Sequence, residues 1–310
     1  MVALAVENNA TYAGGGQDVP LQTSLNAEWA HWVFLNLSRG CVPQAVAEEM
    51  ALRGFDPAFA WFTINWTLAE ARPVPFGFDW HTAANTYVHE PSRLPAGHLL
   101  PTSDWPVKVS LRLARPHVAI LDNILSHQEC DEIIRRSISN LRRSGTVDPQ
   151  TGGELIIDDR TSEGTSFVVN ADPFIARLDR RISEALNWPV DHGEGLQVLH
   201  YLEGGEYKPH FDQFAYNDPG SHHHLAQGGQ RISTLVMYLN DVEAGGSTVF
   251  PEIGLEVMPR KGAAVYFEYT NSLNQTDPLT LHGGAPVGRG EKWIMTKWMH
   301  QRSLALTSMI

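Results

Sequence analysis

The hydrophobic positions of the first hundred residues recur with a helical period. The first helix, expected from about residue 26 to 38, carries an apolar stripe made of Trp29, Trp32, Val33 and Leu37. Proline stands in the first turn of two further segments, 43–53 and 57–71, and Gly54 follows the first of them. Proline is favoured at helix starts and glycine just after helix ends. The pattern therefore predicts three short helices.

The segments around these helices have no such period. Residues 1–23 are polar and contain three consecutive glycines, so we expect a loose arm. Residues 72–106 are rich in proline and predict a connector packed over a surface. We place a domain boundary near residue 100, which gives an N-terminal helical region with its connector (1–100) and a second domain (101–310). The tryptophans of the helices are expected to pack in a core or docking surface. Substrate engagement or dimerisation is the functional alternative for this region.

Beyond residue 106 the pattern changes to the two-residue alternation of β-strands. We expect two strands at 107–113 and 117–121, and a helix at 127–142. A further helix should start at Asp172-Pro173, with an apolar stripe made of Ile175, Leu178, Ile182 and Leu186. Eight short strands are expected at 196–202, 208–212, 231–240, 247–250, 255–258, 263–268, 279–282 and 291–300. The predicted fold is mainly β with flanking helices, a double-stranded β-helix (jelly-roll) core plus a small N-terminal α-helical region.

Composition narrows the classes of function. The 310 residues carry a formal net charge of −12 and no block of Lys or Arg, which argues against a nucleic-acid groove. The two cysteines, Cys41 and Cys130, form no disulfide framework or metal motif and suit a reducing compartment. Residues 1–10 lack the features of a signal peptide, and no apolar run approaches membrane-spanning length. We therefore expect a soluble cytoplasmic protein with no nucleic-acid or membrane partner; its oligomeric state stays open.

A metal-binding pattern lies in the second domain. His210 and Asp212 are two residues apart, so on an extended strand their side chains project from the same face. His282, on a later strand, can supply a third ligand. Two histidines and one carboxylate form the facial set of non-haem Fe(II) oxygenases. The chain has two other His-x-acid pairs, at 127–129 and 192–194, and the first has a helix capping box as its simpler explanation.

A lysine follows His282 by ten residues. Alternation along strand 291–300 places on one face Lys292, Ile294, Thr296, Trp298 and His300. An inward lysine is costly unless it meets an anion, so this one suggests a dicarboxylate cosubstrate beside the metal. The alternative is a lysine that faces solvent on an edge strand.

Several motifs together resemble one family. The segments 200–212, 228–239, 243–251 and 281–300, and more loosely the chain from about Val107 with its segment 160–164, look like the catalytic domain of prolyl 4-hydroxylases. The resemblance is to enzymes of the bacterial type, with an extra N-terminal helical segment. It implies a procollagen-proline 4-dioxygenase-like oxidoreductase that uses Fe(II), 2-oxoglutarate and O2, with ascorbate as reductant.

The resemblance also implies roles for individual residues. The catalytic metal ligands would be His210, Asp212 and His282. The residues that bind the cosubstrate would be Lys292, which pairs with its distal carboxylate, and Tyr238, Tyr201 and Thr234. The residues on the substrate side would be Tyr207, Arg231, Trp298, His300 and Arg160. Each of these side chains also has an ordinary alternative in packing or ion pairing, and 158–164 is equally well explained as a polar loop.

The expected reaction is hydroxylation of an unactivated C–H bond, with release of succinate and CO2. The expected substrate is C4 of a prolyl residue in a peptide or protein. Three alternatives stay open, namely a free amino acid or small metabolite as substrate, nucleic-acid demethylation, and a non-catalytic metal-binding barrel. The run His222-His223-His224 is expected in a mobile surface loop near the cavity entrance, with adventitious metal affinity only.

Overall fold

A computed structural model describes residues 21–74, 87–216 and 218–304. The N-terminal region contains the three expected helices, α1 (Ala27–Ser38), α2 (Pro43–Leu52) and α3 (Pro57–Glu70). The side chains of Asn26 and Asp56 accept hydrogen bonds from the first turns of α1 and α3, and proline begins α2 and α3. The cap and proline signals in the sequence therefore located the helices correctly.

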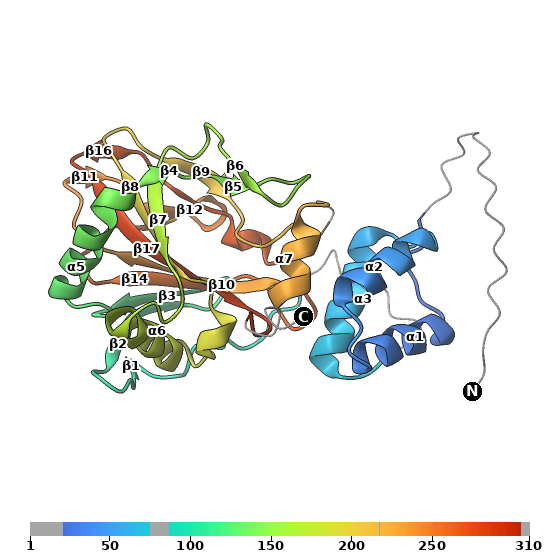
Figure 1. The fold of residues 1–310 in the computed structure, drawn as a ribbon. Coiled ribbons are helices and arrows are strands. Elements are labelled where there is room, and N and C mark those ends of the chain that lie inside the picture. The colour runs from blue at the N-terminus through green and yellow to red at the C-terminus, as the bar shows by residue number, and fades with distance from the viewer. Residues whose placement is uncertain (1–20, 75–86, 217, 305–310) are drawn as a thin grey trace.

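The core of this helical unit is aromatic and continues into the second domain. Trp61 is fully buried and Trp66 nearly so, as expected of core residues. The same hydrophobic cluster includes Phe214 and Leu225, which lie more than 140 positions further along the chain. The three helices thus pack against the second domain (Figure 1).

The second domain is built on a large antiparallel sheet. Within the described residues it has nine strands in the order β1-β2-β3-β14-β10-β17-β8-β7-β4. Their bounds, in that order, are Leu99–Leu100, Val107–Leu113, His117–Asp122, Ala264–Glu268, Arg231–Tyr238, Lys292–His300, Leu196–Tyr201, Glu163–Phe167 and Arg142–Arg143.

A smaller antiparallel sheet lies opposite the large one. Its strands, in spatial order, are β13 (Leu255–Val257), β12 (Thr248–Phe250), β15 (His282–Gly284) and β9 (Tyr207–His210). Two short pairs complete the strands, β11 (Ala244–Gly245) with β16 (Val287–Arg289), and β5 (Thr146–Val147) with β6 (Glu154–Leu155). Side chains of both sheets share one buried cluster, for example Val236 with Phe250. This is the jelly-roll core that the strand pattern predicts.

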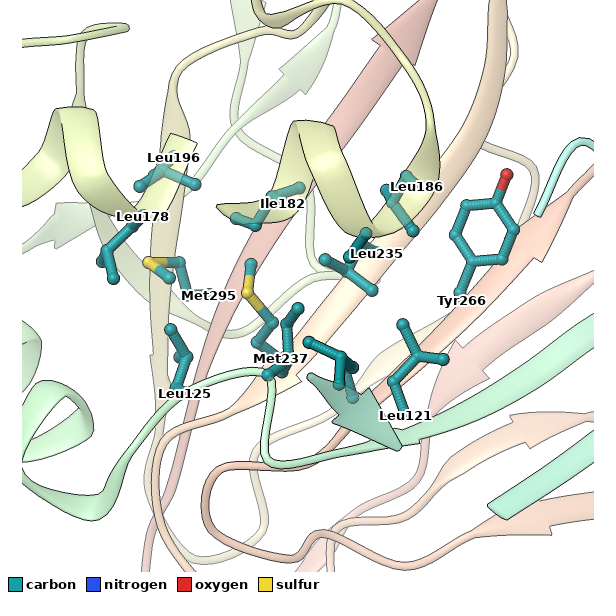
Figure 2. Close-up of a cluster of buried hydrophobic side chains, with 14 of the residues drawn as sticks. Leu121, Leu125, Leu178, Ile182, Leu186, Leu196, Leu235, Met237, Tyr266 and Met295 are labelled. Atoms are coloured by element: carbon teal, nitrogen blue, oxygen red, sulfur yellow. The ribbon is translucent and has the colours of Figure 1, made fainter. Parts of the chain in front are cut away.

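Two helices, α5 (His127–Ser137) and α6 (Pro173–Leu186), cover the outer face of the large sheet. Figure 2 shows α6 lying over the strands, with Ile182 close to Leu235 and Met237 of β10. Because side chains alternate along a strand, Thr234 of β10 points the other way, into the barrel. Helices therefore cover the outer face of the large sheet, and its inner face lines the interior of the barrel.

The structure corrects several expected boundaries. The helix expected at 127–142 ends at Ser137 and continues as the 3₁₀ turn Ile138–Asn140. The strand expected at 208–212 ends at His210, so Asp212 lies just beyond it. In place of a strand at 279–282 there is a 3₁₀ turn, Pro278–Thr280, because Asp277 caps the amide of Leu279. Two further 3₁₀ turns are Val190–His192 and Pro251–Ile253.

The sequence predicted a mobile surface loop for the histidine run, and the structure shows that this prediction was wrong. Residues Ser221–Gly228 form a helix, α7, whose Leu225 is fully buried. Isolated short helices are marginal in water, and tertiary packing stabilises this one. Figure 1 shows α7 between the barrel and the N-terminal helices.

Both cysteines are free thiols, Cys41 exposed and Cys130 buried. The expected reducing environment and the cytoplasmic location both stay predictions. Within the described ranges, no helix is long and apolar enough to cross a membrane.

Candidate active site

The three expected metal ligands lie together at the inner face of the small sheet. Ligand atoms of His210, Asp212 and His282 all lie within 4.8 Å of one another. The Nε2 atom of His210 is 3.5 Å from Oδ1 of Asp212, and that of His282 is 3.4 Å from Oδ2. Such a group of two imidazoles and one carboxylate could hold a divalent metal ion.

Strand pairing and backbone hydrogen bonds orient both imidazoles. His210 of β9 is the direct cross-strand partner of His282 of β15. The Nδ1 atom of His210 lies 2.8 Å from the carbonyl of Lys208, and that of His282 lies 2.9 Å from the carbonyl of Thr280. A carbonyl can only accept, so each Nδ1 carries the proton and each Nε2 lone pair is free for a metal.

The carboxylate is also held by neighbours. Thr234 donates a 2.6 Å hydrogen bond to Oδ2 of Asp212. The threonine oxygen lies 3.2 Å from the hydroxyl of Tyr269 and accepts a hydrogen bond from it. Burial acts to raise the pKa of Asp212, but His282 and His210 outweigh it and hold that pKa well below the usual value. Burial and the neighbouring His282 lower the pKa of His210. The site thus favours an anionic Asp212 carboxylate beside a neutral His210 imidazole.

A cavity of about 590 Å³ opens from this cluster between the two sheets. Lys292 lines it with a side chain that is only 3% exposed, and desolvation lowers the pKa of Lys292 to about 8. Its ammonium lies over the ring of Tyr201 at 5.5 Å, and no hydrogen-bonding or ion-pairing partner for it occurs in the part of the chain that the structure describes. A buried cation without a counterion marks a place for an anion.

A second group of polar residues lies beside Asp212. Arg231 donates hydrogen bonds to both carboxylate oxygens of Glu194, and the distance to Oε2 is 3.0 Å. It also donates to the backbone carbonyl of Asp212 at 3.2 Å. Its guanidinium lies over the rings of Trp298 and Phe214, at 4.2 and 4.7 Å. The arginine is therefore fixed in place by a carboxylate and two aromatic faces.

A third group lines the cavity next to His210. The Tyr207 ring stacks on that of His210 at 3.6 Å, and the Arg160 guanidinium lies 5.0 Å from the Tyr207 ring. Arg160 is buried and donates to the carbonyl of Gly145 and to the side chain of Gln197. Arg160 is thus part of the cavity wall.

The structure brings most of the predicted site residues to one cavity. The predicted residues that line it are His210, Asp212, His282, Lys292, Tyr201, Thr234, Tyr207, Arg231, Trp298 and Arg160. Two lie behind its wall. Tyr238 donates to the hydroxyl of Thr248, and His300 bonds to Glu194; Thr248 and Glu194 both line the cavity.

Sequence reasoning missed Glu194. The pair His192-x-Glu194 was noticed only as a competing metal motif, yet Glu194 is the carboxylate that holds Arg231 and His300. It is 37 positions from Arg231 and 106 from His300, so no local pattern connects them.

A family model and a solved structure are similar to parts of this chain. The sequence model of the 2OG-Fe(II) oxygenase superfamily matches residues 196–300, which contain the whole metal cluster and Lys292. A solved viral collagen prolyl hydroxylase from Paramecium Bursaria Chlorella virus-1, in its 2OG complex, is 28% identical with a TM-score of 0.46, over 58% of this chain and 94% of that one.

Two curated relatives define the family. Probable prolyl 4-hydroxylase 3 of Arabidopsis thaliana is 40% identical over 204 residues, which is 60% of this chain and 69% of the relative. Prolyl 4-hydroxylase 5 of the same plant is 38% identical over 204 residues, 60% of this chain and 68% of the relative. The chain belongs to the prolyl 4-hydroxylase family of Fe(II)- and 2-oxoglutarate-dependent dioxygenases.

Proposed function

We propose that this protein hydroxylates C4 of a prolyl residue in a peptide or protein, and converts 2-oxoglutarate to succinate and CO2 as it does so. The names of the relatives support the substrate class. The observation that carries the proposal is the content of one cavity. It contains the cluster of two histidines and one aspartate, a buried lysine with no counterion among the described residues, and a fixed arginine between aromatic rings.

The residues of the cluster fit Fe(II). His210 and His282 would each present Nε2, because their Nδ1 atoms donate to backbone carbonyls, and Asp212 would present a carboxylate oxygen. Thr234 occupies the other carboxylate oxygen and so limits rotation of the Asp212 side chain. Bound Fe(II), together with 2-oxoglutarate and O2, supplies the oxidising chemistry that a C–H bond requires.

Lys292 would bind the distal carboxylate of 2-oxoglutarate. Its burial excludes competing water, which strengthens the ion pair. Ile294 and Val236, which line the same cavity, keep the surroundings of the cosubstrate apolar.

The opposite side of Asp212 would hold the peptide. Trp298 and Tyr207 offer aromatic faces for a pyrrolidine ring, and Arg231 offers N–H donors for a peptide carbonyl. Glu194 neutralises the arginine charge, so this end suits a neutral backbone segment better than a second carboxylate.

The test measures succinate formed from 2-oxoglutarate under Fe(II), ascorbate and air, with proline-rich peptides or free proline, and mass spectrometry locates the added oxygen. We expect peptide-stimulated turnover and 4-hydroxyproline in the peptide. His210→Ala should abolish it, whereas His31→Ala, at an exposed position of α1, should not.

The other outcomes are equally informative. Turnover of free proline but not of peptides would replace the substrate class with a small metabolite. Absence of succinate under every condition, with metal shown to be bound, would favour the non-catalytic binding module. Omission of ascorbate tests its proposed role as reductant, and an unchanged rate over many turnovers would reject that role.

A further inference from the structure

One wall of the cavity is formed by segments that have no role in metal or cosubstrate binding. The lining residues on the α7 side are Phe214, Ala215, Asp218 and Ser221. The lining residues from the β5–β6 hairpin are Thr146, Val147, Pro149, Gly152, Gly153 and Glu154. We call these two segments the α7–hairpin wall.

The two parts of the α7–hairpin wall are in direct contact. The amide of Gly220 donates to the carbonyl of Pro149 at 2.8 Å, and His224 Nε2 donates to the carbonyl of Gly152 at 2.9 Å. A Cβ atom on Gly152 or Gly220 would overlap the backbone of the other residue, so only glycine permits this approach. The ring of His224 also stacks on Phe214 at 5.0 Å.

The N-terminal helical unit packs against the back of this wall. Trp61 of α3 contacts the ring of His222 of α7, with centroids 5.7 Å apart. Leu225 and Phe214 belong to the same buried cluster as Trp61, and Val147 packs against that cluster. Four segments of the chain thus share one core behind the cavity.

A polar contact strengthens the same interface. Arg302, which follows β17, donates to the side chain of Asn65 of α3 at 3.3 Å and to the carbonyl of Leu225 at 3.0 Å. Residues 59–67 of α3 are buried all round, and such a helix must be covered on every side. Phe214, Leu225 and Arg302 of the second domain supply part of that cover.

We propose that the N-terminal helical unit is a substrate-positioning element, which acts through His222 and Leu225 to hold the α7–hairpin wall in place beside the metal cluster. The inference rests on the proposed peptide hydroxylation and goes further, because it assigns a role in catalysis to a region outside the matched oxygenase segment. His222 is the positioning residue of this contact, since it belongs to the first turn of α7 and its ring contacts that of Trp61.

The α7–hairpin wall is separate from the residues expected to bind the cosubstrate, so we assign it to the peptide. The residues expected to bind 2-oxoglutarate come from β8, β10 and β17, whose positions are fixed by sheet hydrogen bonds. The α7–hairpin wall lies on short elements outside the large sheet, and side-chain packing against α3 contributes to their stability. Loosening the wall should therefore weaken peptide binding and leave cosubstrate binding unchanged.

The experiment compares His222→Ala with His223→Ala in the full chain. His223 is the exposed neighbour on the same helix, so its loss controls for helix propensity and for removal of an imidazole. We expect His222→Ala to raise the KM for a proline-rich peptide about fivefold, the factor expected for loss of one aromatic pair. The KM for 2-oxoglutarate and the peptide-independent succinate rate should stay within about twofold. His222→Phe, which restores a ring against Trp61, should return the peptide KM toward that of the wild type.

Amide hydrogen exchange supplies a readout that does not need turnover. Exchange in residues 218–228 should be faster in His222→Ala than in His223→Ala or His222→Phe. Equal peptide KM values in both alanine variants, or a parallel rise in the KM for 2-oxoglutarate, would overturn the positioning role. If the wild type hydroxylates no peptide, the proposed function fails, and unchanged exchange in His222→Ala would separately reject the structural link.

Discussion

Lys292→Met should make the metal-free, cosubstrate-free protein more stable while abolishing turnover. The pKa of Lys292 falls from its usual 10.5 to about 8 because the ammonium is desolvated. At about 1.4 kcal/mol per pKa unit, the buried charge costs about 3 kcal/mol of folding free energy. The contact with the Tyr201 ring, which methionine loses, offsets up to about 1 kcal/mol.

The net gain is about 2 kcal/mol, or roughly 4 °C in Tm by calorimetry at pH 7. The size of this gain depends on pH in a defined way. Below pH 8 Lys292 is protonated in both the folded and the unfolded chain, so the desolvation cost of its charge is fully present. Between pH 8 and 10.5 the folded chain loses this proton while the unfolded chain keeps it, so the cost disappears. The Tm values of wild type and variant should therefore converge as pH rises toward 10.5.

Lys208→Met is the matched control. Lys208 is 57% exposed and pairs with the equally exposed Asp159, so its replacement should cost less than about 1 kcal/mol. 2-Oxoglutarate should raise the Tm of metal-loaded wild type but not of metal-loaded Lys292→Met. A Lys292→Met protein that is no more stable than wild type at pH 7, or a difference that grows with pH, would refute the assignment of Lys292 as a buried cation awaiting an anion.

Three further outcomes follow from the site. Thr234→Val removes the hydrogen bond to Asp212 and should weaken Fe(II) or Mn(II) binding about tenfold, measured by titration; unchanged affinity would show that the carboxylate needs no such support. Glu194→Gln leaves the guanidinium of Arg231 without its carboxylate and should cost about 1–3 kcal/mol in denaturant unfolding. The variant should lose less stability at acid pH than the wild type, because Arg231 and the hydrogen bond to His300 hold the pKa of Glu194 low against burial. In the wild type, kcat/KM for 2-oxoglutarate should fall above pH 8 as Lys292 loses its proton, whereas Lys292→Arg, if active, should show no such fall.

The local periods of the sequence determined much of the site. Two-residue alternation correctly placed Lys292, Ile294, Thr296 and Trp298 on the inner face of β17. The His-x-Asp spacing likewise identified two members of the cluster before any fold was known. The alternation along β17 succeeds because the direction of a side chain depends on the backbone of its own strand, whereas Asp212 joins the cluster from just beyond the end of β9.

Other features depended on contacts between distant parts of the chain. The pairing of His210 with His282 comes from the register of β9 against β15, and the bonding of Glu194 to Arg231 joins two elements that share no pattern. The histidine run predicts a loop because it lies in a Gly- and Pro-containing stretch between strands. Packing of Leu225 and His222 against α3 makes it a helix instead. The sequence therefore determined the chemistry and the local direction of the side chains, whereas tertiary packing decided which residues meet, since burial of apolar area is shared among segments that no local period connects.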